Sequence, residues 1–176
     1  MGGEKKFAEK LDQNFEGNHY RHDNEPGHHY VYLYDYCGQP WKTQELVRKH
    51  VRENYKNAPD GVNGNDDCGQ MSAWYLFSVM GFYPVTPGSN EFAIGAPQFP
   101  EITLRLKDHD LKIIAENLSE ENKYVQSVSL DGKKVLTPFL NYFDLIGAKE
   151  IRFVMGRMVP IVHHTGESTE YPKLIL

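Results

Sequence analysis

The sequence predicts an α+β fold, with helices in the first half of the chain and antiparallel strands in the second. Apolar residues recur every three to four positions before residue 84 and every second position after residue 101. Between these regions, Pro84–Gly88 contains two prolines and a glycine, and we take it as the main internal boundary. Because helices and strands do not alternate along the chain, a doubly wound parallel sheet is disfavoured.

Two stretches before the boundary have the spacing of amphipathic helices. Their apolar stripes are formed by Phe7, Leu11 and Phe15, and by Leu46, Val47, Val51 and Tyr55. Thr43 is the expected N-cap of the second helix, because its hydroxyl can accept a hydrogen bond from the first turn.

Two further segments of the first half are apolar. Met71–Met80 is apolar on every side, so we expect a deeply buried helix that ends at Gly81. Tyr30–Tyr36 alternates like a strand, but it is also short and apolar enough for a turn of buried helix. Periodicity leaves both assignments open.

Strands are predicted wherever apolar residues alternate after the boundary. The four segments are Ile102–Leu106, Leu111–Ala115, Tyr124–Leu130 and Ile151–Met155. Turns are expected at Lys107–Asp110 and at Asp131–Gly132, the second leading into Lys133–Leu136. Residues 159–176 lack a clear period and are expected to form a disordered tail.

Composition narrows the class of protein. The 176 residues carry a formal charge of −5 with scattered basic residues, which disfavours nucleic-acid binding. No apolar run is long enough to span a membrane, and the first ten residues lack the apolar stretch of a signal peptide. Cys37 and Cys68 form either one disulfide or two free thiols.

Two polar clusters come directly before apolar segments. They are residues 22–29 (HDNEPGHH) and 61–72 (GVNGNDDCGQMS). Carboxylates, amides and glycines together suit an oxygen-liganded cation or a polyhydroxylated ligand. The plainer alternative is a solvated turn in the first cluster and a helix-capping turn in the second. Capping needs only one side chain, however. The adjacent Asp66 and Asp67 carboxylates repel each other unless their charge is neutralised or they have a role in binding or catalysis.

Several familiar sites do not fit these residues. An EF-hand fails, because Cys68 stands where its glycine belongs and Trp74 where its glutamate belongs. The histidines of the first cluster lack zinc spacing, and no nucleophile elbow is present. Trp41 is expected in a loop ahead of a helix, as either a sugar-stacking platform or a core residue.

Five blocks of sequence, in this order, resemble the C-terminal part of the glycoside hydrolase family 92 α-mannosidases. They are NEP at 24–26 with YLY at 32–34, PWKTQ at 40–44, GNDDCGQMSAWY at 64–75, GFYPV at 81–85, and PG at 87–88. The match continues through IGAP at 94–97 and YVQS at 124–127, and covers about residues 7–156. Each block alone is weak, whereas their order is highly specific.

The resemblance implies a calcium-dependent, inverting exo-α-mannosidase (EC 3.2.1.-) acting on terminal α-linked mannose of glycans, such as α-1,2 linkages of N-glycans. Such enzymes have an N-terminal β-sandwich and an (α/α)6 barrel, and they are typically exported, which implies a periplasmic or secreted protein. Residues 1–83 would then be the last helices of the barrel and 84–158 an antiparallel β appendage.

The resemblance also assigns roles to individual residues. Inversion needs a carboxylic acid on one side of the sugar and a carboxylate base activating water on the other. Asp67 matches the base, and Asp66 would support it. The expected Ca²⁺ ligands are Asn24, Glu25 and Asp67, and the expected substrate contacts are Glu25, His28, His29 and Trp41.

One departure from the family concerns the general acid, which lies in a segment upstream of every block matched here. We therefore expect the isolated chain to lack activity and to depend on the rest of the parent catalytic domain. The alternatives are a non-catalytic module that binds carbohydrate or calcium, and a purely structural fragment.

Overall fold

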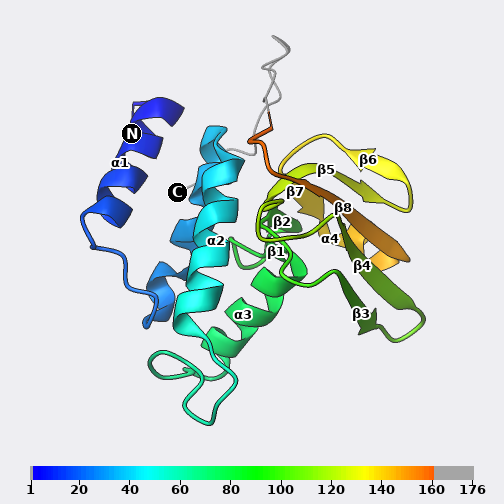
Figure 1. Ribbon diagram of the computed structural model, residues 1–176, viewed down its shortest axis with the longest axis horizontal. Coiled ribbons are helices and arrows are strands. Elements are labelled where there is room, and N and C mark those ends of the chain that lie inside the picture. Colours follow the sequence, from blue (N-terminus) through cyan, green and yellow to red (C-terminus); the bar gives the residue numbers. More distant parts are fainter. Residues whose placement is uncertain (1, 161–176) are drawn as a thin grey trace.

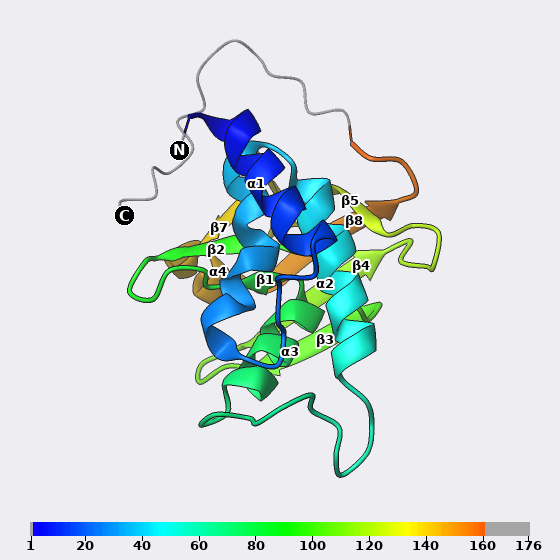
Figure 2. The same cartoon turned by 90° about the vertical axis from the view of Figure 1, so that its left-hand side faces the viewer.

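The chain is described by a computed structural model that covers residues 2–160. Helices gather on one side of the molecule and strands on the other (Figure 1). Figure 2, viewed from the helical side, shows α1 outermost. The helical elements are α1 (Glu4–Glu16), the 3-10 helix η1 (Glu25–Cys37), α2 (Pro40–Asn54) and α3 (Gln70–Met80).

The strands form two sheets, in the orders β3-β4-β8-β5-β6 and β1-β2-β7. A short helix, α4 (Tyr142–Gly147), lies between β7 and β8 in the chain. The strands are β1 (Phe82–Tyr83), β2 (Glu91–Ile94), β3 (Glu101–Arg105), β4 (Asp110–Glu116), β5 (Tyr124–Leu130), β6 (Lys133–Val135), β7 (Phe139–Asn141) and β8 (Glu150–Gly156). The α+β class is therefore confirmed.

The two amphipathic helices are confirmed as α1 and α2, with a different start for the second. Helix α2 begins at Pro40, with Gln39 at the N-cap, because proline suits the first turn of a helix. Thr43 is buried inside the helix, so its predicted capping role is wrong. Trp41 consequently lies in the first helical turn rather than in a loop. The ambiguous segment Tyr30–Tyr36 is helical, as part of η1.

Helix α3 ends where the sequence predicts. Gly81 adopts φ 95°, and its N–H bonds to the carbonyls of Phe77 and Ser78. The expected deep burial holds for only one face: Trp74 is fully buried, whereas Leu76 is 57% exposed. Nothing within the described residues covers Leu76, so this apolar helix exposes one large side chain to water.

The four predicted strands are confirmed as β3, β4, β5 and β8, but their pairing is not wholly antiparallel. Strand β4 pairs in parallel with β8, because the intervening chain, which includes β5 to β7 and α4, forms a long crossover connection. A β-bulge at Gln126 breaks the expected alternation in β5, so that Val125 and Val128 are both buried while Gln126 is exposed.

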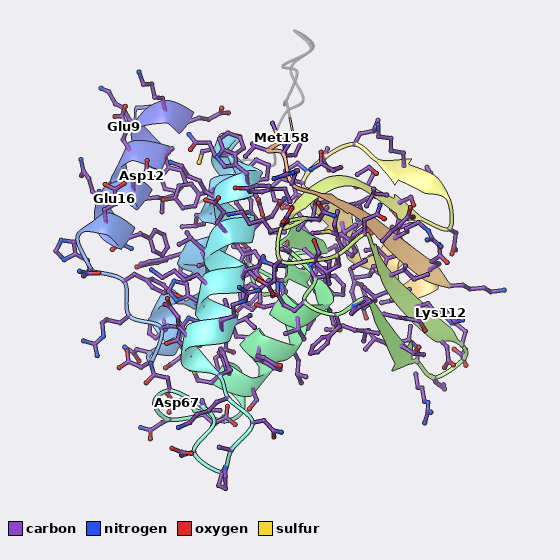
Figure 3. The ribbon with its side chains drawn as sticks, in the orientation of Figure 1. Glu9, Asp12, Glu16, Asp67, Lys112 and Met158 are labelled. Atoms are coloured by element: carbon purple, nitrogen blue, oxygen red, sulfur yellow. The ribbon has the colours of Figure 1, made fainter. Side chains whose placement is uncertain are left out.

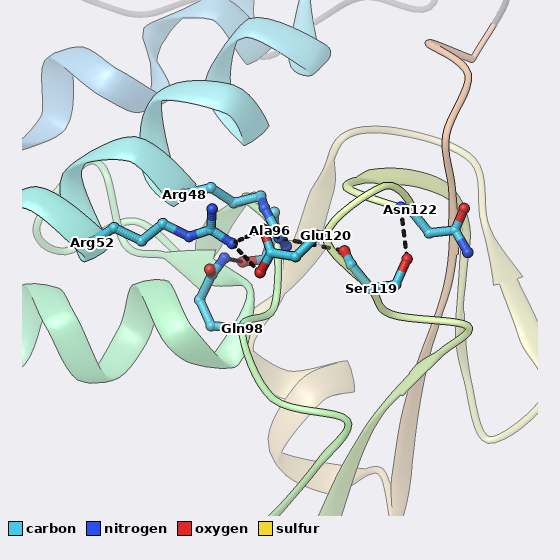
Figure 4. Close-up of polar contacts among 7 residues, drawn as sticks. All are labelled: Arg48, Arg52, Ala96, Gln98, Ser119, Glu120 and Asn122. Atoms are coloured by element: carbon cyan, nitrogen blue, oxygen red, sulfur yellow. Dashed lines mark hydrogen bonds and ion pairs between the residues drawn. The ribbon is translucent and has the colours of Figure 1, made fainter.

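The core continues across the predicted boundary. Phe77 of α3 packs against Phe82 and Phe92, which belong to the main cluster beneath the sheets. On the outer side, Arg52 of α2 binds the Glu120 carboxylate at 2.6 Å in the loop between β4 and β5 (Figure 4). The helical and sheet parts are thereby packed together, and their separation into domains at residue 84 stays a prediction.

Three smaller expectations concern the cysteines, the membrane and the tail. Cys37 is buried and Cys68 exposed, and both are free thiols. Among residues 2–160 no helix is both long and apolar enough to cross a membrane. Of the predicted tail, residues 159 and 160 have no regular structure, and 161–176 lie outside the described residues.

Candidate functional site

The two polar clusters lie against each other, although about forty residues separate them in the chain. The contact is made by Gly64, which adopts φ 93° in the loop between α2 and α3. A Cβ at this position would lie 2.8 Å from the carbonyl oxygen of Asp23, so glycine permits both the backbone conformation and the close approach. The loop itself is held by a bridge between Tyr55 and Val62.

The adjacent aspartates have different surroundings. Asp66 Oδ1 accepts the backbone N–H of Ser72 at 2.8 Å, which satisfies a free donor in the first turn of α3. Asp67 is exposed at the start of a left-handed run in which Asp67, Cys68 and Gly69 have φ values of 46°, 60° and 91°. Figure 3 shows Asp67 in the loop at one end of the molecule, away from α1 and Met158.

Glu25 and Asp67 form a carboxylate pair between the two clusters. A side-chain hydrogen bond with Glu25 raises the pKa of Asp67, desolvation adds to it, and repulsion from Glu25 and Asp66 raises it further. Both side chains are exposed, so water and ligands can reach them. Two carboxylates that interact in this way are suited to sharing a cation or a proton.

A buried floor of hydrogen-bonded rings lies next to the pair. His28, 1% exposed, donates from Nε2 to the carbonyl of His22 at 3.0 Å. Its Nδ1 is 3.3 Å from the side-chain amide nitrogen of Gln70, which also donates to the Tyr83 hydroxyl at 3.1 Å. Trp74 Nε1 donates to the carbonyl of His28 at 3.1 Å. Burial lowers the pKa of His28, consistent with a neutral ring.

The other predicted site residues differ in position. Asn24 is exposed at the N-cap of η1, directly before Glu25. His29 is half-buried on η1, and its ring meets that of Tyr30 edge-on at 4.7 Å. Trp41 is not brought together with them, because it lies in the first turn of α2 whereas the Asp67 loop follows the last. A 15-residue helix separates the two by about 22 Å.

Sequence reasoning did not single out three residues that bind the site together: His22, Tyr55 and Gln70. Gln70 lies inside the matched block GNDDCGQMSAWY, so its presence there was a usable signal. Tyr55 and His22 looked like an apolar stripe residue and an exposed loop histidine, and only the folded contacts reveal their partners.

The residues available for a metal are few. Within residues 2–160 no group of three or more His, Cys, Asp or Glu side chains could hold a metal ion. Glu25 and Asp67 therefore offer two carboxylates, beside the amide of Asn24. A hollow of about 550 Å³ lies elsewhere, lined by β6, β7 and α4.

Comparison with known proteins shows the family to which the chain belongs. The sequence model of the glycosyl hydrolase family 92 catalytic domain matches residues 1–157. The GH92 α-mannosidase BT3965 of Bacteroides thetaiotaomicron is 42% identical with a TM-score of 0.83, covering 89% of this chain and 22% of that one. The GH92 inverting mannosidase BT2199 of the same organism is 33% identical with a TM-score of 0.80, covering 90% of this chain and 25% of that one.

A curated relative from the fungus Arthroderma benhamiae, an uncharacterized secreted glycosidase, is 26% identical over 161 residues. The match covers 89% of this chain and 21% of that protein, so this chain spans about a fifth to a quarter of the length of these relatives. The family match over residues 1–157 includes both polar clusters and the eight strands of the described residues. The chain belongs to glycosyl hydrolase family 92.

Proposed function

We propose that this chain is the C-terminal part of a secreted or periplasmic exo-α-mannosidase that hydrolyses terminal α-linked mannose, including α-1,2 linkages, with inversion. The named activities of two structural relatives and the secreted curated relative support this proposal. The observation that carries it is the exposed Glu25 and Asp67 carboxylate pair, which the Gly64 contact brings together from two separate segments.

In this proposal Asp67 is the general base. Its carboxylate accepts a proton from the water that attacks the anomeric carbon, on the face opposite the leaving group. Asp66 accepts the Ser72 N–H and so fixes the turn that carries Asp67. The general acid comes from a segment that this chain does not contain, so that this chain provides the base side of the reaction.

Asn24, Glu25 and Asp67 would supply part of a Ca²⁺ site, because Ca²⁺ prefers carboxylate and amide oxygens. The repulsion that raises the pKa of Asp67 beside Glu25 would be relieved by a divalent cation between them. Glu25 and Asp67, with Asn24, would supply protein oxygens, and sugar hydroxyls or the rest of the protein would complete the ligand set. When bound, the ion would orient the mannose 2- and 3-hydroxyls and favour ring flattening.

The exposed Leu76 side chain of α3 supports a place inside a larger catalytic unit. Leu76 is 57% exposed on a helix that has no polar face. In the proposed parent protein, further helices of an (α/α)6 barrel cover this side chain, residues 1–83 are the last barrel helices, and 84–158 are the β appendage. His29 and Trp41 remain proposed mannose contacts, of which Trp41 would need a separate part of the glycan. His28 is 1% exposed and both of its ring nitrogens have partners, so we propose that it supports the site from beneath rather than touching the sugar.

The test compares variants of the full-length protein on α-1,2-mannobiose. Asp67→Asn should lower kcat about 10²- to 10⁴-fold, the usual contribution of a general base. Asp60→Asn is the matched control, because Asp60 is exposed in the same loop and pairs only with Lys56, at 2.7 Å, among the described residues. Full activity of Asp67→Asn would exclude it as the base, and turnover by the isolated chain would contradict the missing acid.

The alternative is a module that binds carbohydrate or calcium without chemistry. It is favoured by the exposed carboxylate pair, which suits binding as well as catalysis. Calorimetry with Ca²⁺ and mannose separates the two: binding by a full-length protein that never releases mannose would support the module.

A further inference from the structure

We propose that Tyr55 and His22 are positioning residues that hold the Asp66–Asp67 turn against the Asn24–Glu25 segment. This inference rests on the proposed function and adds two residues to it. Neither side chain belongs to the carboxylate pair; His22 is buried, Tyr55 is half-buried, and the two are hydrogen-bonded to each other.

The directions of the hydrogen bonds follow from the acceptors. The Tyr55 hydroxyl donates its single hydrogen to the carbonyl of Met71 at 3.0 Å, because a carbonyl can only accept. Its 2.9 Å contact with His22 Nε2 therefore has the ring N–H as donor. His22 Nδ1 is then an acceptor, and the Tyr20 hydroxyl donates to it at 2.8 Å. The chain of bonds selects one neutral tautomer of His22.

This chain of bonds connects both halves of the site. The carbonyl of Met71 accepts the Tyr55 hydroxyl, and the N–H of Met71 donates to the carbonyl of Asp66 at 3.3 Å. At the other end, the carbonyl of His22 accepts the ring N–H of His28. The next residue, Asp23, is in close contact with Gly64. A shift of either ring would therefore move one carboxylate relative to the other.

The rings are also fixed by packing. Tyr55 stacks on Trp74 with a centroid distance of 5.9 Å and an interplanar angle of 7°. His22 meets the same indole edge-on at 4.3 Å and 73°. Because phenylalanine retains the stacking, Tyr55→Phe removes the two hydrogen bonds and leaves the ring in place.

The experiment measures steady-state kinetics of the full-length protein on α-1,2-mannobiose. Tyr55→Phe should lower kcat about tenfold, the scale seen when an outer-shell partner is lost, with KM changed less than about twofold. Tyr75→Phe is the matched control: its ring lies 4.9 Å from that of Tyr55, and its hydroxyl makes no hydrogen bond within residues 2–160. It should leave both constants unchanged.

A second variant keeps the test decisive if Tyr55→Phe does not fold, as judged by near-ultraviolet circular dichroism. Tyr20→Phe removes the donor to His22 Nδ1, one step further from the site, and should lower kcat by a smaller factor. Equal kcat values for Tyr55→Phe and Tyr75→Phe would overturn the positioning role, as would a change in KM alone. A wild-type protein that neither hydrolyses the substrate nor binds Ca²⁺ would instead overturn the proposed function.

Discussion

A buried carboxyl group outside the site offers a quantitative test of the structure. Asp35 lies in η1 with 0% exposure, and neither of its side-chain oxygens has a hydrogen-bond partner among residues 2–160. Burial raises the pKa of Asp35 well above its ordinary value, and the nearby Thr43 hydroxyl offsets part of this rise. Asp35→Asn keeps the shape of the side chain and removes its titration.

The size of the effect follows from a proton count. Between the unfolded and folded pKa values of Asp35, the folded chain keeps a proton that the unfolded chain has lost. The free energy of unfolding therefore falls by about 1.4 kcal/mol for each pH unit gained in this interval. Asp35→Asn has no such dependence at this position. The stability of Asp35→Asn relative to wild type should therefore grow as the pH rises from 5 to 7.

Urea unfolding of both proteins at pH 5, 6 and 7 measures this difference. Other titrating groups contribute equally to the two proteins and cancel in the comparison. Asp108→Asn is the control, because Asp108 is exposed in the turn between β3 and β4. A difference between Asp35→Asn and wild type that stays constant with pH would refute the raised pKa of Asp35.

Three further outcomes are expected from urea unfolding. Burial lowers the pKa of His50 from 6.5 to about 4, so the stabilising contribution of this group is complete above pH 6.5 and is lost in acid; between pH 7 and pH 5 this contribution falls by up to about 2 kcal/mol, which should appear as a pH-dependent difference in stability between wild type and His50→Gln. Gly64→Ala should cost about 1–2 kcal/mol, because it combines a left-handed φ with a clash against Asp23; an unchanged midpoint would contradict that contact. Phe153→Ala, at 0% exposure, should cost about 3–5 kcal/mol, and Leu136→Ala, at 82% exposure, less than about 0.5 kcal/mol.

Local sequence signals predicted the elements well and their connections poorly. Gly81 ends α3 as expected, because a residue with positive φ closes a helix in any surroundings. The bulge at Gln126 and the parallel pairing of β4 with β8 depend on contacts between distant strands, which alternation does not encode. Thr43 has the chemistry of an N-cap, but Pro40 starts the helix earlier.

The candidate site was predicted as two clusters, and the contact between them came from the fold. The repulsion between adjacent carboxylates suggested that Asp66 and Asp67 have a functional role. Their spacing could not show that Asp66 is the one that accepts a backbone N–H in the first turn of α3. Trp41 was proposed as a sugar-stacking residue from its expected place in a loop, and nothing in its local pattern indicated its distance from Asp67. His22 and Tyr55 could not be predicted, because their roles depend on partners remote in sequence.

The turn that carries Asp67 explains why the surrounding contacts matter. Left-handed backbone at Asp67 and Cys68 costs roughly 1–2 kcal/mol for each residue. Asp66 offsets this cost with three hydrogen bonds, one from Ser72 to its side chain and two from Gly69 and Met71 to its carbonyl, each contributing about 1 kcal/mol. These values nearly cancel, so the turn by itself has little preference for the conformation that faces Glu25. Its position therefore depends on the contacts at its edges, namely the Tyr55 hydroxyl on α3 and Gly64 against Asp23. The sequence places the proposed base, Asp67, in a strained loop, and in our proposal the hydrogen-bonded rings of Tyr55 and His22 beside that loop select its conformation.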